Sequence, residues 1–145
     1  MNSDIKFFEL PDFSITESDL CKWLFKCAVT YGVTINQLYY NFVSPQELLD
    51  LNQTHLDHDT DTDIITFSYT PSPELSAEIY ISTEMMIKNA KEFSVKPDNE
   101  LLRLLSHGFL HSIGYSDKTT KDKQLMTTQE DHCISLFHVK QSNHV

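Results

Sequence analysis

The stretch Ser106-His107-Gly108-Phe109-Leu110-His111-Ser112-Ile113-Gly114-Tyr115-Ser116-Asp117 carries the strongest structural signal in the chain. Its two histidines, His107 and His111, are four residues apart, so on a helix both imidazoles project from one face about one turn apart. That spacing allows two ring nitrogens to reach one ion at roughly 2.0–2.1 Å, as zinc requires. Gly114 can adopt the left-handed conformation that ends a helix, which would allow Asp117 to return as a third ligand. Three protein ligands leave one position open, as in catalytic metal sites.

The residues around the two histidines are strongly apolar, which predicts a buried helix from about residue 98 to residue 113. Histidines in such a helix need partners, because burying an unpaired polar group costs roughly 1–3 kcal/mol. Gly108 also lies in mid-helix, where it costs roughly 0.5–1 kcal/mol relative to alanine. Such a glycine usually marks the close approach of another backbone or a ligand. These features favour metal binding by His107 and His111, and a polar network in the core is the alternative.

The rest of the chain alternates between strand-like and helix-like segments without a strict strand–helix–strand order, which indicates an α+β fold. Ser14 with Glu17 and Ser44 with Glu47 have the spacing of capping boxes, and Asp98 is the expected N-cap of the apolar helix. We therefore expect a single domain over residues 1–145, in which a small mixed β-sheet of about four strands packs with five helices. The metal site would lie on the central apolar helix and the loop that follows it. The expected strands are 5–8, 35–43, 64–69 and 77–81, and the expected helices are about 17–31, 45–53, 82–93, 98–113 and 127–139.

Composition and charge exclude several classes of protein. The chain has 145 residues and a formal net charge of −10, which disfavours non-specific coating of nucleic acid, because phosphate binding needs clustered cations. No apolar run approaches the roughly 18–20 residues of a membrane span, and the first residues lack the regions of a secretory signal. The three cysteines include no Cys-x-x-Cys pair, so we expect a cytoplasmic protein with reduced thiols and no membrane partner.

Several motifs, in order along the chain, resemble those of the YbeY family of bacterial zinc-dependent endoribonucleases. The segment from His107 to Asp117 resembles the family pattern His-Gly-x-Leu-His-x-x-Gly-Tyr-x-His. Further matches cover about residues 35–137, and they are Leu51-Asn52, Thr62-Asp63-Ile64-Ile65-Thr66-Phe67, Glu78-Ile79-Tyr80-Ile81-Ser82, and Met126 with Glu130. The resemblance implies a Zn²⁺-dependent, single-strand-specific endoribonuclease of ribosomal RNA processing and ribosome maturation. Its partners would be ribosomal RNA precursors and the ribosome or small-subunit proteins.

The chain departs from the family pattern at two positions. Asp117 replaces the third histidine, so the expected zinc ligands are His107, His111 and Asp117, a set that zinc accepts. The family commonly carries an arginine shortly after Leu-Asn, where this chain has Leu56. Leu56 cannot hold a phosphate, so either the substrate contact is weaker or another cation takes that role.

Arg103, the only arginine, is the obvious substitute, because it lies one turn before His107 on the same helix face. Its planar fork could hold a phosphate bidentately, whereas the alternative is an ion pair with Glu100 three residues earlier. Lys118 and Lys121 follow the metal segment, with Lys123, and are the other candidates for substrate binding. A solvated charged surface is the alternative for these lysines.

The general base of such a hydrolase is not identified by the sequence. In His-Glu-x-x-His peptidases the glutamate beside the first histidine takes the proton from water, and Gly108 stands in that place here. Asp63, Glu130 or a substrate phosphate oxygen could serve instead. Two other functions stay open: a metalloprotease-like hydrolase of another substrate, and a non-catalytic ribosome-associated factor whose zinc only stabilises the fold.

Overall fold

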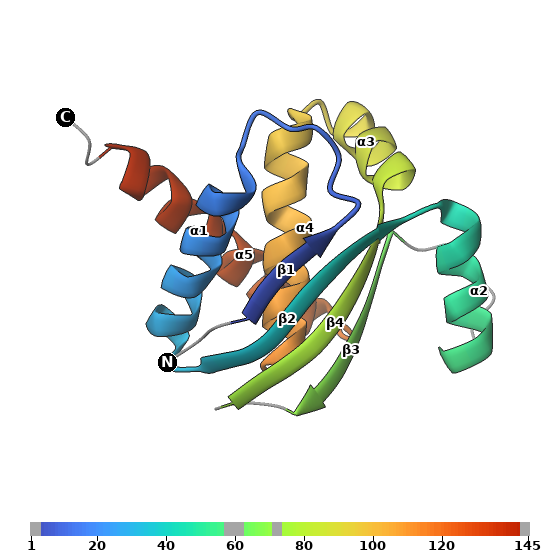
Figure 1. Cartoon of the computed structure of the whole chain (residues 1–145), viewed down its shortest axis with the longest axis horizontal. Helices are drawn as coiled ribbons and strands as arrows, with labels where there is room; N and C mark the ends of the chain where they lie inside the picture. The colour runs from blue at the N-terminus through green and yellow to red at the C-terminus, as the bar shows by residue number, and fades with distance from the viewer. Residues whose placement is uncertain (1–3, 57–62, 71–73, 143–145) are drawn as a thin grey trace.

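The structure, a computed structural model, describes residues 4–56, 63–70 and 74–142 (Figure 1). Within these residues it has the α+β class, the four strands and the five helices that the sequence predicts. The turn expected at Pro71-Ser72-Pro73 lies outside the described residues. In chain order the elements are β1 (Asp4–Phe8), α1 (Glu17–Tyr31), β2 (Thr34–Val43), α2 (Pro45–Leu56), β3 (Ile64–Thr70), β4 (Glu74–Ser82), α3 (Thr83–Glu92), α4 (Pro97–Ser112) and α5 (Thr120–Ser142).

The four strands form one mixed sheet in the order β1-β2-β4-β3. Strand β2 is parallel to both β1 and β4, whereas β3 is antiparallel to β4. Helices α1, α4 and α5 lie behind one face of this sheet, and α2 stands at its outer end (Figure 1). The sheet and these three helices therefore enclose one core, and α4 lies at its centre.

Alternation along the strands decides which side chains enter that core. Leu38, Tyr40 and Phe42 of β2 are buried, as their spacing predicts, and Ile79 and Ile81 of the neighbouring β4 are buried beside them. The hydroxyl group of Tyr40 donates a hydrogen bond of 2.8 Å to the carbonyl oxygen of Leu105 in α4. Because α4 is buried against this sheet, its polar residues are held in fixed positions.

Helix α4 starts one residue earlier than the sequence predicts. Lys96 is its N-cap and makes no side-chain capping bond, and Pro97 occupies the first turn. Asp98, the expected N-cap, instead lies inside the helix and accepts a hydrogen bond from Ser14. Proline suits the first turn because its missing N–H has no partner there.

The capping box predicted at Ser14 is wrong, whereas the one predicted at Ser44 is confirmed. Helix α1 is capped by Thr16, whose hydroxyl oxygen accepts from the backbone N–H of Asp19 at 3.1 Å. At the start of α2, the Ser44 hydroxyl oxygen accepts from the N–H of Glu47, and the Glu47 carboxylate accepts from the N–H of Ser44, both at 3.1 Å. Ser14 and Thr16 are two residues apart and both can cap a helix, so the spacing alone does not identify which of them is the N-cap of α1.

The last helix begins at Thr120, seven residues before the expected start at 127. Its first turns are polar, so the apolar periodicity used for the prediction begins only near Met126. A capping contact fixes the earlier start, since the Thr119 hydroxyl oxygen accepts from the N–H of Asp122 at 3.0 Å. This earlier start places the N-terminus of α5 close behind the loop that carries Asp117.

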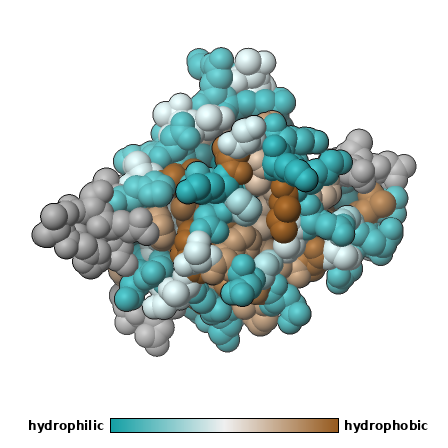
Figure 2. Space-filling view, turned by 90° about the horizontal axis from the view of Figure 1, so that it is seen from above, coloured by the Kyte–Doolittle hydropathy of each residue, from teal (hydrophilic) through white to brown (hydrophobic). Residues whose placement is uncertain are grey.

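The surface mixes apolar and polar side chains. Figure 2 shows apolar residues interspersed with polar ones on the face seen from above. Exposed large apolar residues include Ile87, Phe93 and Val95, at and after α3, and scattered residues of this kind are normal on protein surfaces. Among the helices that the structure describes, none is both long and apolar enough to cross a membrane.

Candidate metal centre

The candidate metal centre is formed by α4 and the loop that follows it. His107 and His111 lie on the same face of α4 with their ring centroids 5.0 Å apart. After Ser112 the chain turns back: Gly114 has a φ of 115°, and the N–H of Tyr115 donates to the carbonyl oxygen of Leu110 at 3.0 Å. Glycine adopts this backbone conformation readily, because it has no Cβ.

This turn brings Asp117 against both imidazoles. The Nε2 atom of His107 lies 3.3 Å from one carboxylate oxygen of Asp117, and the Nε2 atom of His111 lies 3.4 Å from the other. One ligand atom from each residue can be chosen so that all three lie within 4.8 Å of one another. The three residues that the sequence selects are thus brought together, and the cluster could hold a metal ion.

The cluster is open to solvent on one side. The side chains of His107, His111 and Asp117 are 15%, 33% and 39% exposed, so the site lies at the surface with His107 deepest. An ion bound there would keep at least one position accessible to water or a substrate, which is the feature that separates catalytic from structural sites.

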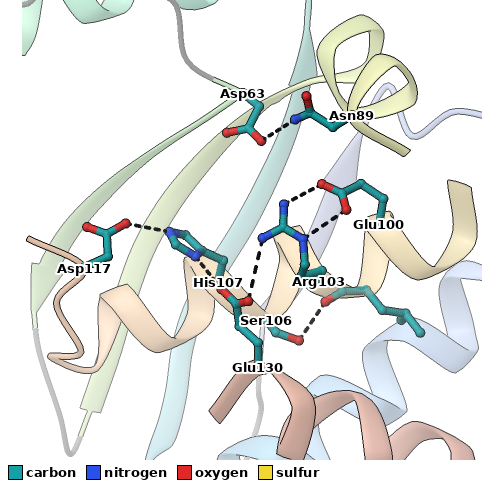
Figure 3. A network of polar contacts seen from close by, with 9 residues as sticks. Asp63, Asn89, Glu100, Arg103, Ser106, His107, Asp117 and Glu130 are labelled. Atoms are coloured by element: carbon teal, nitrogen blue, oxygen red, sulfur yellow. Dashed lines mark hydrogen bonds and ion pairs between the residues drawn. The ribbon is translucent and has the colours of Figure 1, made fainter. Parts of the chain in front are cut away.

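The second ring nitrogen of His107 faces the interior of the protein. Its Nδ1 atom lies 2.6 Å from a carboxylate oxygen of Glu130 on α5, and the Glu130 side chain is only 4% exposed. When the imidazole is neutral and Nδ1–H donates to this carboxylate, Nε2 keeps its lone pair toward Asp117. Glu130 therefore lies behind the ring, away from the open side of the cluster (Figure 3).

Arg103 is held by carboxylates, and the ion pair with Glu100 that the sequence left open is present. Its Nε and Nη2 atoms donate to the two carboxylate oxygens of Glu100 at 3.0 and 2.5 Å, and its Nη1 atom lies 3.7 Å from Glu130. The hydrogen bond with Glu100 raises the pKa of Arg103 above its usual value. Its contact with a phosphate stays a prediction.

The other residues considered from the sequence lie around this centre. Asp63 precedes β3, and its carboxylate accepts from the Asn89 side chain at 2.9 Å; Figure 3 shows this pair apart from the histidine cluster. Lys118 follows Asp117 directly and is exposed, and Lys121 and Lys123 are exposed in the first turn of α5. Leu56 ends α2, and its side chain lies outside the described part of the structure.

Two features of the centre went unrecognised in the sequence. The sequence offers Glu130 as a family match and as a base, but not as a partner of His107, yet Met126, Glu130, Cys133 and Phe137 are all buried on one face of α5. A charged residue within such an apolar stripe is the signal that marks it as a partner of another buried polar group. Ile79 was not connected with Gly108, although a Cβ at residue 108 would lie 2.7 Å from the Ile79 side chain. Gly108 is therefore closely approached, but by the Ile79 side chain of strand β4 rather than by the backbone or ligand that the sequence predicts.

The structure is that of an α+β protein whose central helix and following loop carry a solvent-open cluster of two histidines and one aspartate that could hold a metal ion. The family model described as Endoribonuclease YbeY matches residues 13–138, and the chain belongs to the YbeY family. Proteins named Endoribonuclease YbeY from Flavobacterium johnsoniae and Christiangramia forsetii are each 40% identical to it, over 94% and 95% of this chain and 99% and 97% of theirs. The protein of that name from Bacteroides thetaiotaomicron is 33% identical over 88% of this chain and 92% of its own.

A solved structure has the same fold. The solution structure of TM1509 from Thermotoga maritima superposes with a TM-score of 0.68 at 25% sequence identity, covering 97% of this chain and 93% of that one. The arrangement of strands and helices that carries the cluster is therefore shared beyond the relatives of higher identity.

Proposed function

We propose that this protein is a zinc-dependent, single-strand-specific endoribonuclease that acts in ribosomal RNA processing and ribosome maturation, as one catalytic domain over residues 1–145. Membership of the YbeY family, whose relatives are named as endoribonucleases, supports the reaction. The substrate would be a ribosomal RNA precursor, presented in the cytoplasm by the ribosome or small-subunit proteins. The acidic net charge of −10 supports such help, because binding to naked RNA depends on clustered cations.

One geometric observation carries the metal assignment. For a tetrahedral zinc ion with ligand distances of roughly 2.0–2.1 Å, two ligand atoms lie about 3.3–3.4 Å apart. The two distances from Asp117 oxygens to the Nε2 atoms of His107 and His111 are 3.3 and 3.4 Å. Each distance ends on a different oxygen of Asp117, and one ligand atom from each of the three residues lies within 4.8 Å of the others. This close grouping of two imidazole nitrogens and a carboxylate supports a shared ion.

Different residues of the chain would bind the ion and take the proton from water. His107, His111 and Asp117 would hold zinc, which when bound supplies a Lewis acid that polarises a phosphate oxygen and acidifies water. Glu130 contacts the Nδ1 atom of His107, on the side of the ring away from solvent. It is therefore poorly placed to take a proton from water on the open side of the cluster. Asp63, whose carboxylate accepts a hydrogen bond from Asn89, and a substrate phosphate oxygen then remain as the candidate bases.

Cationic side chains beside the cluster would bind the phosphates of the RNA backbone. Lys118 and Lys121 are exposed next to Asp117 and would contact phosphates flanking the scissile bond. Arg103 is the third substrate-binding candidate, although Glu100 already engages two of its nitrogens. Because only a few cations gather there, few phosphates would be neutralised, so the affinity for RNA should be weak and should fall only modestly as salt rises.

A peptidase function is disfavoured by the environment of Gly108. A peptidase of the His-Glu-x-x-His type needs a glutamate there, facing the metal. In this fold a side chain at residue 108 would collide with buried Ile79 of β4. The position faces the core, so a base at this point of the helix has no room.

Metal stoichiometry tests the site. The parent protein should bind one zinc ion per chain after loading and desalting, and Asp117→Ala should lower that content while Asp131→Ala, an exposed position on α5, should not. His107→Ala should lower it as well, with His132→Ala as the matched histidine control. An Asp117→Ala protein with parental zinc content would contradict the proposed ligand set.

A further inference from the structure

A chain of charged side chains runs from the interior of the protein to the candidate metal centre. Glu100 binds Arg103 through two hydrogen bonds, Arg103 lies 3.7 Å from Glu130, and Glu130 contacts His107 at 2.6 Å. The side chains of Glu100 and Glu130 are 2% and 4% exposed. Figure 3 shows Glu100, Arg103, Glu130 and His107 in sequence along one side of α4.

We propose that Glu100, Arg103 and Glu130 form a positioning relay that sets the tautomer and orientation of His107. The inference rests on the metal site of the proposed function and extends it to residues that do not contact the ion. Glu130 acts directly, because its carboxylate accepts from Nδ1–H and leaves Nε2 as the metal ligand. Glu100 and Arg103 act through Glu130.

Arg103 is needed because two carboxylates are buried side by side. Its guanidinium group spans them, with Nε and Nη2 on Glu100 and Nη1 toward Glu130. Buried carboxylates are retained only when paired, and the rigid fork of arginine can serve both at once, whereas lysine offers a single point charge. With its three nitrogens directed at carboxylates, Arg103 is better arranged to hold Glu130 in place than to bind a phosphate.

The charge of the relay also suits a cation at the centre. Two glutamates and one arginine leave one net negative charge behind His107. Asp117 contributes another on the open side, so together they match the charge of one divalent ion. Outer partners of this kind orient metal-binding histidines and raise their basicity as ligands.

Zinc affinity, measured by competition with a chromophoric chelator, tests the relay. Glu130→Ala should weaken zinc binding roughly 10–100-fold, as loss of an outer carboxylate partner usually does. Glu100→Gln and Arg103→Lys should each weaken it by about threefold or more, through the same route. Glu92→Gln, at an exposed glutamate on α3, is the matched control and should leave the affinity unchanged. Glu100→Gln should cause no further loss in the Glu130→Ala background, because its effect passes through Glu130.

A second readout needs no metal. For the neutral imidazole of His107 in the metal-free parent, nitrogen-15 NMR should show the tautomer with the proton on Nδ1 and none on Nε2. In the Glu130→Ala protein the population with Nε2 protonated should rise. Parental zinc affinity and tautomer in both Glu130→Ala and Glu100→Gln would overturn the relay, and if Glu130→Ala does not fold, Glu100→Gln decides.

The two proposals fail differently. If the parent binds no zinc, or His107→Ala binds as well as the parent, the proposed site fails. If the parent binds zinc through His107 while Arg103→Lys changes only the KM for RNA, the relay fails alone and Arg103 is a phosphate contact.

Discussion

Replacing Gly108 with alanine tests how closely α4 is packed against the sheet. A Cβ at residue 108 would lie 2.7, 3.0 and 3.2 Å from the Cδ1, Cγ2 and Cγ1 atoms of Ile79. Ile79 is fully buried in the centre of β4, and β-branched side chains are stiff. Either this side chain or the helix must therefore shift, and a shifted helix would also displace the neighbouring His107.

The expected magnitude follows from two opposing effects. Alanine in mid-helix is favoured over glycine by about 0.8–1.0 kcal/mol, whereas overpacking a well-packed core costs about 1–3 kcal/mol. With three close contacts on one buried side chain, we expect overpacking to win and Gly108→Ala to lower the free energy of unfolding by about 1 kcal/mol. A glycine in open space would instead gain stability on this change.

Urea denaturation followed by circular dichroism measures this directly, and a second substitution provides the control. Ile79→Val removes Cδ1, the closest atom, at a cost of about 0.5–1.5 kcal/mol by itself. The Gly108→Ala, Ile79→Val double variant should therefore be more stable than additivity predicts, by about 1 kcal/mol. Stabilisation by Gly108→Ala alone, or strict additivity in the double variant, would refute the packing argument.

Three further predictions concern the core, a helix cap and the reaction. Burial raises the pKa of Tyr40 well above its usual value, so the unfolded chain ionises this tyrosine first as the pH rises. Its contribution to the free energy of unfolding is therefore complete below about pH 10 and is lost as the pH rises above that value. Tyr40→Phe should flatten this alkaline loss of stability in denaturation curves measured between pH 8 and 11. Ser44→Ala should lower the free energy of unfolding by about 1 kcal/mol, because the capping box with Glu47 is lost; an unchanged urea midpoint would contradict this. Asp63→Asn should reduce RNA cleavage roughly 10²–10⁴-fold if Asp63 is the base, with zinc content unchanged, and parental turnover would exclude Asp63.

Local patterns in the sequence predict much of this fold because they report local physics. The alternation of Leu38, Tyr40 and Phe42 identifies β2 and its buried face, since successive side chains on a strand point to opposite sides. The i,i+4 spacing of His107 and His111 predicts a shared face on α4, and Gly114 predicts the turn that follows. Each of these inferences concerns residues within about one or two helical turns of each other.

Features that depend on distant contacts could not be predicted in this way. Glu130 meets His107 across 23 residues, and Ile79 meets Gly108 only because β4 lies beneath α4. Both contacts follow from the packing of one element on another. A charged residue on an apolar helix face and a glycine in mid-helix each indicate that a contact partner exists, but only the tertiary structure identifies that partner.

Cleavage of a fluorescent single-stranded RNA by the zinc-loaded protein tests the central claim most directly. His107→Ala, His111→Ala and the His132→Ala control would be purified identically and assayed beside the parent. The account predicts cleavage by the parent and by His132→Ala, and its loss in the other two variants. Equal cleavage by all four proteins, or none by the zinc-loaded parent even with small ribosomal subunits added, would contradict a metal-dependent ribonuclease centred on His107 and His111.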